Sequence, residues 1–396
     1  MSLRVSSICA KDPKDPKTTN PHQLPIYATS SFEFESIDEG IDIFRNPDSA
    51  HIYGRFGNPT VDAVANKIAS LEALGTNVND EFGIMTSSGL SAITTLVLTE
   101  LRSGDKILTQ GNLYGGTTEL LKNTLSRSGI DVVLTDLSDL AKVDQILSQE
   151  KDIKALYLET PSNPLLDCVD LESLGNLAKS HSICTIIDNT FCTPILQQPF
   201  KYGIDYIVHS TTKYLNGHGN VISGVIVGKG KKNRDEVWKT MKLLGTNGNP
   251  FDAWLVNQGM KTLTLRMDRH NSNAMALSQY LESHPKIERV YYLGLPSHKY
   301  HSLAKKQMTG YTGMMCFEVK GGFDEGVAFM NAQTMGALAP TLGDVDTLIM
   351  HPASMSHLNV SKEIRERNGI KDSLIRVSVG IEDVKDIIED FDRALG

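Results

Sequence analysis

A lysine that follows an apolar run is the residue with the clearest chemical potential in this chain. Lys213 stands in the segment DYIVHSTTKYLNGHGN (205–220), together with the hydroxyl groups of Ser210 and Thr212. An amine at the end of a strand and among hydroxyl groups suits a Schiff base with a phosphorylated carbonyl compound. A lone lysine after a strand is more often simply solvated, so the neighbouring motifs must decide between these two interpretations.

An aspartate ends a second apolar run, CTIIDNTFCTP (184–194). Asp188 precedes Lys213 by 25 residues, which is the separation of neighbouring strands in a βαβ unit. At the carboxyl ends of such strands both side chains would face the crevice where α/β folds bind ligands. Alone, Asp188 is more often a turn or cap residue. Paired with Lys213, it is the carboxylate expected to hold the pyridine nitrogen of pyridoxal phosphate in its protonated form.

A third motif offers a place for a phosphate group. In MTSSGLSAITTLVLTEL (85–101), Ser88 and Gly89 directly precede a strongly helical run. The free N–H groups and the positive end of a helix dipole bind anions there, although a Ser-Gly pair is also a common helix cap. No G-x-x-x-x-G-K-[ST] follows, and no G-x-G-x-x-G opens the first βα unit, so ATP and dinucleotides lack their glycines. The phosphate of a smaller cofactor remains.

The elements that must position these residues follow from the patterning of 396 residues. Residues 1–60 are rich in Pro, Ser, Asn and Gly, and we expect an extended arm that packs on another surface, such as a neighbouring subunit. Residues 61–255 alternate helical segments with short apolar runs, which predicts an α/β domain with a mostly parallel sheet covered by helices. Residues 256–396 predict a smaller α+β domain with strands in IERVYYL, GMMCFEVK and SLIRVSVG. A long connecting helix with a kink or break is expected over 249–284.

Composition excludes several classes of protein. The net charge of −8 disfavours nucleic acid and anionic membranes as partners. Five cysteines without a C-x-x-C pair fit neither a disulfide framework nor a zinc site, so we expect no metal and a reducing, cytoplasmic compartment. No run approaches the roughly 18 apolar residues of a membrane span, and no signal peptide is evident.

Ordered segments along essentially the whole chain resemble the Cys/Met-metabolism family of pyridoxal-phosphate enzymes, the γ-family of fold type I. These segments are PIYATSSFEF, YGRFGNPT, SSGLSAI, NLYGGT, YLETPSNP, IIDNTF, HSTTKYLNGHG, GMKTLTLRM, HPASMSH and LIRVSVGIED. The resemblance implies a fold-type-I architecture, pyridoxal 5'-phosphate as cofactor, a small amino-acid substrate, and a homotetramer built from dimers with shared active sites.

The resemblance also implies individual roles. Lys213 would bind the cofactor covalently and move protons, Asp188 would pair with the ring nitrogen, and Tyr114 would stack on the ring and protonate the leaving group. Tyr53 and Arg55 would reach the phosphate of the neighbouring subunit. The full set expected at the cofactor is Tyr53, Arg55, Ser88, Gly89, Leu90, Tyr114, Asn163, Asp188, Ser210, Thr212 and Lys213.

The residues expected at the substrate are Arg376, Thr341, Gly116 and Met350. Arg376 would hold the α-carboxylate with its planar fork. Relatives that split methionine commonly carry a cysteine where Gly116 stands, which weakens a methionine substrate. Relatives that act on cystathionine tend to carry an acidic residue where Met350 stands, which weakens cystathionine. The block LGDVDTLIMHPASMSH nevertheless resembles methionine γ-lyases most.

These features predict a cytoplasmic carbon–sulfur lyase of sulfur amino acid metabolism. It would catalyse α,γ-elimination of methionine, homocysteine or, less favoured, cystathionine, giving 2-oxobutyrate, ammonia and a thiol. The alternative is γ-replacement on an O-acylhomoserine, as in a sulfhydrylase or cystathionine γ-synthase. A nicotinamide-dependent oxidoreductase of the same layout is a remote alternative, and Tyr114 and Arg376 disfavour a non-catalytic binding protein. His209 and His218 are expected to pack and hydrogen-bond rather than to act as acids or bases.

Overall fold

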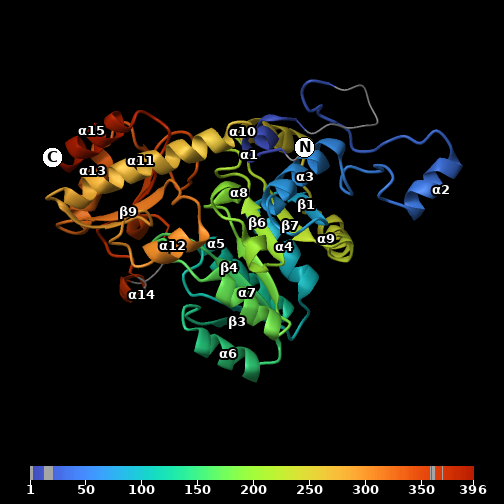
Figure 1. The fold of residues 1–396 in the computed structure, drawn as a ribbon, viewed down its shortest axis with the longest axis horizontal. Coiled ribbons are helices and arrows are strands. Elements are labelled where there is room, and N and C mark those ends of the chain that lie inside the picture. The colour runs from blue at the N-terminus through green and yellow to red at the C-terminus, as the bar shows by residue number, and fades with distance from the viewer. Residues whose placement is uncertain (1–2, 13–20, 357, 359–361, 368) are drawn as a thin grey trace.

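Two β-sheets, joined by a long helix, make up the body of the protein (Figure 1). The computed structural model describes residues 3–12, 21–356, 358, 362–367 and 369–396. The joining helix is α11 (Leu263–Ser283), which runs from the larger sheet to the smaller one. No helix among these described residues is long and apolar enough to cross a membrane.

The larger sheet has seven strands in the order β1-β7-β6-β5-β4-β2-β3. The strands are β1 (Glu81–Thr86), β2 (Lys106–Thr109), β3 (Asp131–Leu134), β4 (Ile153–Glu159), β5 (Cys184–Asp188), β6 (Tyr206–Ser210) and β7 (Gly224–Lys229). From β3 to β6 all neighbours are parallel, whereas β7 runs antiparallel to both β6 and β1. The prediction of a mostly parallel sheet is therefore confirmed.

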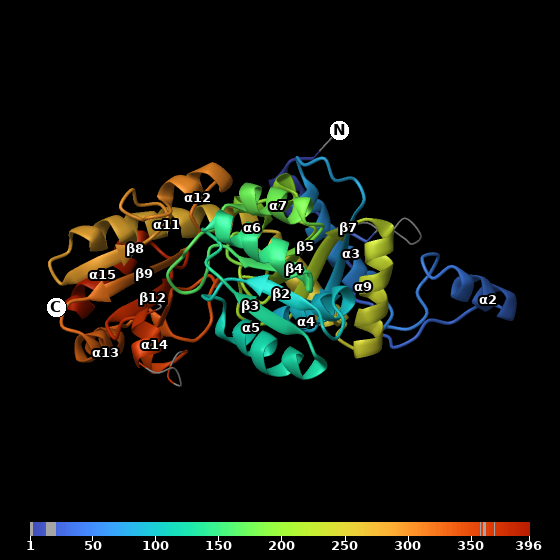
Figure 2. The ribbon, with the colours of Figure 1, turned by 90° about the horizontal axis from the view of Figure 1, so that it is seen from below.

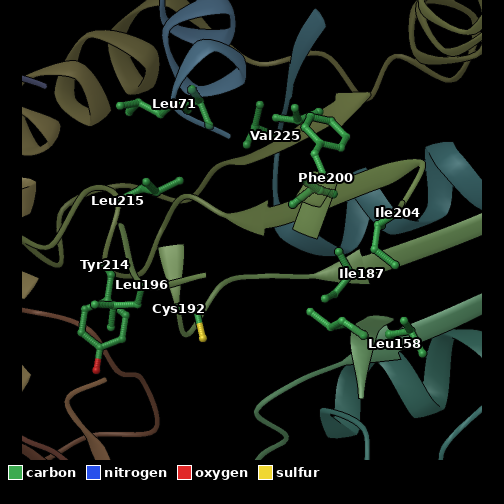
Figure 3. Packing of buried hydrophobic residues seen from close by; sticks show 14 of the residues in the cluster. Leu71, Leu158, Ile187, Cys192, Leu196, Phe200, Ile204, Tyr214, Leu215 and Val225 are labelled. Carbon is green, nitrogen blue, oxygen red and sulfur yellow. The ribbon is translucent and has the colours of Figure 1, made fainter. Parts of the chain in front are cut away.

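Helices cover both faces of this sheet, because successive strand residues point to opposite sides. On β5, Ile186 packs in the cluster that contains Leu96 of α4, whereas Ile187 packs in the cluster that contains Ile68 of α3. Figure 3 shows Ile187 in this second cluster, close to Leu158. The helical segments of this part are α1 (Val5–Ala10), α2 (Ile37–Arg45), α3 (Pro59–Ala73), α4 (Gly89–Glu100), α5 (Gly115–Glu119), η1 (Leu120–Thr124), η2 (Leu125–Ser128), α6 (Leu140–Gln149), α7 (Leu171–Ser180), α8 (Thr193–Leu196), η3 (Pro199–Tyr202), α9 (Lys231–Leu244) and α10 (Pro250–Met260).

The smaller sheet has five strands in the order β10-β11-β12-β9-β8. They are β8 (Ile287–Tyr291), β9 (Met314–Val319), β10 (Ala337–Leu338), β11 (Leu348–Met350) and β12 (Leu374–Ser378), and its other helices are α12 (His301–Gln307), α13 (Phe323–Ala332), η4 (Pro352–Ser354), α14 (Lys362–Arg367) and α15 (Val384–Leu395). One face packs apolar side chains against α11, α13 and α15. The strands β8, β9 and β12 were expected from the sequence; the short β10 and β11 were not.

A break separates α10 from α11 at residues 261–262, within the segment where the sequence predicts a kink or break. Arg266 of α11 spans this break, since its guanidinium donates to the carbonyl of Gly259 at 2.9 Å. The same guanidinium donates to the carbonyl of Tyr214 at 2.8 Å, in the turn that follows β6. Arg266 therefore ties the start of α11 to the turn that carries Lys213.

The N-terminal segment is less uniformly extended than its composition suggests. Helix α1 is anchored in the body, because Cys9 is fully buried and its carbonyl accepts a hydrogen bond from Lys67 at 2.8 Å. Helix α2 lies at the end of a strand-poor excursion that projects away from the body (Figure 2). Ile37 and Phe44 of α2 are 82% and 62% exposed. Part of the arm thus packs on its own chain, and part presents apolar side chains outward.

Candidate active site

Lys213 lies in a tight turn directly after β6. Its backbone N–H donates to the carbonyl of Ser210 at 3.1 Å, and its carbonyl accepts from Gly217 at 2.8 Å. The side-chain amine donates to the hydroxyl of Thr341 at 2.6 Å, across from the loop between β10 and β11. Burial, and then the Arg376 guanidinium, lower the pKa of Lys213. A larger share of neutral amine follows, which is the form that acts as nucleophile and base.

Asp188 ends β5, so it stands beside the start of the Lys213 turn at the carboxyl edge of the sheet. Its carboxylate accepts the N–H of Thr190 at 2.9 Å, and the Thr190 hydroxyl accepts the N–H of Ser210 at 2.8 Å. Burial raises the pKa of Asp188, while the hydrogen bonds from Thr190 lower it. A cationic partner would favour the ionised carboxylate in this buried place.

The N-terminus of α4 lies against Ser210. Ser88 is the cap of this helix: its hydroxyl accepts the N–H of Ser91 at 3.1 Å, and the Ser91 hydroxyl accepts the N–H of Ser88 at 2.8 Å. The next amides, those of Gly89 and Leu90, open the first turn. A Cβ atom on Gly89 would lie only 2.8 Å from the Cβ of Ser210. The glycine therefore lets the helix end and Ser210 form one cradle for an anion.

Thr212 is already engaged within the turn. Its hydroxyl accepts the N–H of Ser223 at 3.0 Å and donates to the Ser223 carbonyl at 3.2 Å. These bonds tie the Lys213 turn to the segment that leads into β7. A hydrogen bond from Thr212 to a phosphate would require its hydroxyl proton to turn away from that carbonyl.

Arg376 of β12 brings the smaller sheet to the site. It is 5% exposed, and its two terminal nitrogens donate to the side-chain oxygen of Asn163 at 3.2 Å and to the carbonyl of Thr341 at 2.9 Å. Its Nε atom is buried without a partner, and no carboxylate of the described chain pairs with it. A buried guanidinium satisfied only by neutral oxygens is suited to an anionic ligand such as a carboxylate.

Met350 and Arg376 are directly opposite one another on β11 and β12. Cross-strand partners of this kind project from the same face of a sheet. Met350 is 2% exposed. It therefore places an uncharged side chain on the face of the smaller sheet that carries Arg376.

Tyr114 is the cap residue of α5 and lies half exposed at the end of the loop after β2. A Cβ atom on Gly116 would lie 2.6 Å from the Tyr114 ring and 3.3 Å from Leu90. Gly116 is thus a steric necessity for this ring position. Leu90 and Tyr114 approach each other above the N-terminus of α4.

Tyr53 and Arg55 lie elsewhere on this chain. The Arg55 guanidinium stacks over the rings of Tyr53 and Phe56, at 5.5 and 5.1 Å, and donates to the carbonyl of Lys242 in α9. The recorded contacts of both side chains stay within the arm and α9. Of the residues expected from the sequence, these two are not brought to the Lys213 cluster of their own chain.

Two residues that the sequence analysis did not single out belong to the cluster. Thr190 links Asp188 to the Lys213 turn, as described above. Glu159 ends β4, is 6% exposed, and lies beside Asp188 in the sheet register. The available signal was a carboxylate at the end of the apolar run IKALYLE, at the same edge as Asp188.

The two histidines behave as structural groups. His209 is fully buried, with its Nε2 atom 2.6 Å from the carboxylate of Glu72, which is also fully buried. The Nδ1 atom of His218 lies 2.7 Å from the carbonyl of Asn216. Both rings pack and hydrogen-bond within the chain, as the sequence analysis expected.

Comparison with known proteins assigns this arrangement to a family. Residues 6–396 match the family described as Cys/Met metabolism PLP-dependent enzyme. The chain belongs to this family. The L-methionine gamma-lyase of Fusobacterium nucleatum subsp. polymorphum is 45% identical over 376 residues, which cover 94% of this chain and 93% of that protein. The O-succinylhomoserine sulfhydrylase of Pseudomonas aeruginosa is 40% identical over 374 residues, which cover 94% of this chain and 91% of that one.

Solved structures agree with this assignment. The crystal structure of cystathionine gamma-lyase from Lactobacillus plantarum, complexed with L-serine, superposes with a TM-score of 0.90 at 36% sequence identity. The match covers 99% of this chain and 98% of that one. The fold-type-I architecture expected from the sequence is confirmed, and the nicotinamide alternative has no support left.

Pyridoxal 5'-phosphate is the cofactor of this Cys/Met metabolism enzyme, and the site fits it on three observations. The cradle between Gly89 and Ser210, too narrow for a Cβ atom, suits a phosphate. The buried Asp188 carboxylate suits a cationic ring nitrogen, and the partly buried Lys213 amine, with its lowered pKa, suits a covalent bond to a carbonyl carbon. Arg376 is left for the substrate.

Proposed function

We propose that this enzyme is a carbon–sulfur lyase that catalyses α,γ-elimination of a methionine- or homocysteine-type substrate, giving 2-oxobutyrate, ammonia and a thiol. The observation that carries the proposal is the hydrogen-bonded series from Lys213 through Thr341 to Arg376. It places an amine that accepts protons beside a guanidinium that suits a carboxylate. That combination suits removal of a proton from the α-carbon of an amino acid.

The residues divide the work as follows. Arg376 binds the α-carboxylate and so orients the α-carbon toward Lys213. Lys213 accepts the α-proton, and the Thr341 hydroxyl holds its amine in place until the substrate arrives. Bound pyridoxal phosphate supplies the electron sink that makes this proton acidic. Asp188 contributes the negative charge that stabilises a protonated ring nitrogen.

Tyr114 is the proposed acid toward the leaving group. Its ring is half exposed at the mouth of the site, above Leu90 and Gly116. A phenol in this position can donate its proton to a departing sulfur atom. Gly116 supports this role only by leaving room for the ring.

Met350 carries the preference for an uncharged substrate tail. An apolar side chain beside Arg376 loses nothing when a methylthio group approaches. The distal ammonium of cystathionine would meet no countercharge from Met350, and leaving a buried cation unpaired costs several kcal/mol. We therefore rank methionine and homocysteine above cystathionine.

A second candidate function is γ-replacement on an O-acylhomoserine. It is favoured by Gly116, which relatives acting on acylhomoserines share, and by the 40% identity to an O-succinylhomoserine sulfhydrylase. Both reactions need the same Lys213, Asp188 and Arg376. They differ in whether water or a thiol captures the intermediate after the leaving group has departed.

We further propose a cytoplasmic homotetramer whose dimers share active sites, with domain limits at 1–60, 61–255 and 256–396. The exposed Ile37 and Phe44 of α2 give the arm an apolar surface for a neighbouring subunit. Tyr53 and Arg55, which lie away from their own Lys213 cluster, would then contribute to the phosphate site of that neighbour. This arrangement would give a monomer only an incomplete site.

A parallel assay tests the proposal. The release of 2-oxobutyrate is measured from methionine, homocysteine, cystathionine and O-acetylhomoserine, the last with and without an added thiol. We expect the highest kcat/KM with methionine or homocysteine. A preference for O-acetylhomoserine, with a thioether as product when thiol is present, would instead establish the replacement reaction.

A further inference from the structure

Glu159 is a buried carboxyl group whose two oxygens hold two separate loops. Oε2 accepts the backbone N–H of Tyr114 at 2.8 Å, and Oε1 accepts the backbone N–H of Asn163 at 3.3 Å. Tyr114 follows β2, whereas Asn163 follows β4. One side chain therefore sets the backbone position of both the proposed acid and the residue that contacts Arg376.

The direction of the Glu159 side chain is itself fixed by its backbone. Gln110, at the end of β2, donates to the Glu159 carbonyl at 2.8 Å and accepts the Glu159 N–H at 3.3 Å. Asn112 joins the same two loops further out, through hydrogen bonds of 2.8 Å to Ser162 and to Asp167. The loops after β2 and β4 thus form one hydrogen-bonded unit, and Glu159 is its member beside Asp188.

The protonation of Glu159 suits its place beside Asp188. Burial, and then the negative charge of Asp188, raise the pKa of Glu159 to about 8, while the N–H groups of Tyr114 and Asn163 oppose this rise. When one of two adjacent buried carboxyl groups keeps its proton, the other can ionise more easily. A neutral Glu159 leaves the negative charge to Asp188, where a cationic ring nitrogen needs it.

We propose that Glu159 is a positioning residue that holds Tyr114 and Asn163 at the cofactor by accepting one backbone N–H from each. This inference rests on the proposed placement of Tyr114 and Asn163 beside the cofactor ring, but not on the identity of the substrate. Glutamine has nearly the same shape, yet it replaces one oxygen by an NH₂ group. That group would face a backbone N–H donor, so one of the two loops must move.

The variant Glu159→Gln tests this role, with Glu100→Gln as the matched control. Glu100 also has a buried carboxyl that accepts a side-chain hydrogen bond, from Tyr206 at 2.7 Å, but Tyr206 is at the opposite end of β6 from Ser210. We expect Glu159→Gln to lower the visible circular dichroism of the bound cofactor at least twofold and kcat at least tenfold. Glu100→Gln should change neither. Equal losses in both variants, or unchanged dichroism in Glu159→Gln, would overturn the proposal.

A double-mutant comparison separates positioning from general damage. If Glu159 acts through Tyr114, the change Tyr114→Phe should reduce kcat much less in the Glu159→Gln background than in the wild type. Independent, additive losses would refute the proposal. This readout depends on turnover, whereas the circular dichroism is measured without substrate, so a wrong substrate assignment and a wrong role for Glu159 give different results.

A measurement on the unaltered holoenzyme covers the case in which Glu159→Gln does not fold. Hydrogen exchange resolved to single residues should show the Tyr114 amide exchanging at least tenfold more slowly than the amides of Gly115 and Gly116, which open α5. The first amides of a helix have no partner within the helix itself. Exchange of Tyr114 as fast as that of Gly116 would show that Glu159 does not hold this amide.

Discussion

Replacing Arg376 by lysine keeps the positive charge but removes the fork. The two terminal nitrogens of Arg376 now reach two separate oxygens, those of Asn163 and Thr341, so both are directed into the site. A carboxylate bound there would receive two charge-assisted hydrogen bonds, and an ammonium on the shorter reach of lysine retains one. The loss of one such bond costs about 1.5–3 kcal/mol, which corresponds to a decrease in kcat/KM of about tenfold to about 150-fold.

The assay separates binding from chemistry. A carboxylate is held equally before and during proton removal, so most of the loss should appear as a higher KM, with a smaller change in kcat. The control is Arg393→Lys, because Arg393 forms an ion pair with Asp390 on α15, outside the site. If Arg376→Lys keeps kcat/KM within threefold of the wild type, Arg376 does not hold the carboxylate and the proposed orientation of the substrate is wrong.

Three further changes test other parts of the site. Gly89→Ala should weaken cofactor binding by about tenfold, or about 1.4 kcal/mol, in a titration of the apoprotein, whereas Gly111→Ala, where a Cβ atom meets nothing within 4 Å, should leave it unchanged. Met350→Glu should raise kcat/KM for cystathionine relative to methionine by on the order of tenfold, and an unchanged ratio would remove Met350 from the tail pocket. Mixing Lys213→Ala chains with Arg55→Ala chains should recover part of the activity through hybrid dimers, and hybrids verified by mass spectrometry that stay inactive would argue against shared sites.

Much of the larger sheet can be predicted from the sequence because apolar runs and their spacing encode neighbouring parallel strands. Asp188 and Lys213 show this, since their separation placed them on β5 and after β6 before any coordinates were considered. The direction of β7 could not be predicted in this way. A short buried strand reads the same in either direction, and only its hydrogen bonds show that it runs antiparallel to β6.

The contacts across the site depend on long-range packing that residue types do not encode. The hydrogen bond from Lys213 to Thr341 joins residues 128 positions apart. The pairing of Met350 with Arg376 needs the register of β11, a strand of three residues that the sequence pattern did not reveal. Glu159 was missed because its partners are backbone amides, which every residue except proline possesses.

The break before α11 makes this helix a lever. Its 21 residues span about 30 Å at 1.5 Å per residue, so a rotation of about 4° at residues 261–262 would displace the far end by about 2 Å. Arg376 belongs to the sheet that packs on this lever, whereas Lys213 stays with the fulcrum, because Arg266 clamps both the break and the lysine turn. The distance between the group that anchors the substrate and the group that moves its proton is therefore set by a small angle at one place in the chain.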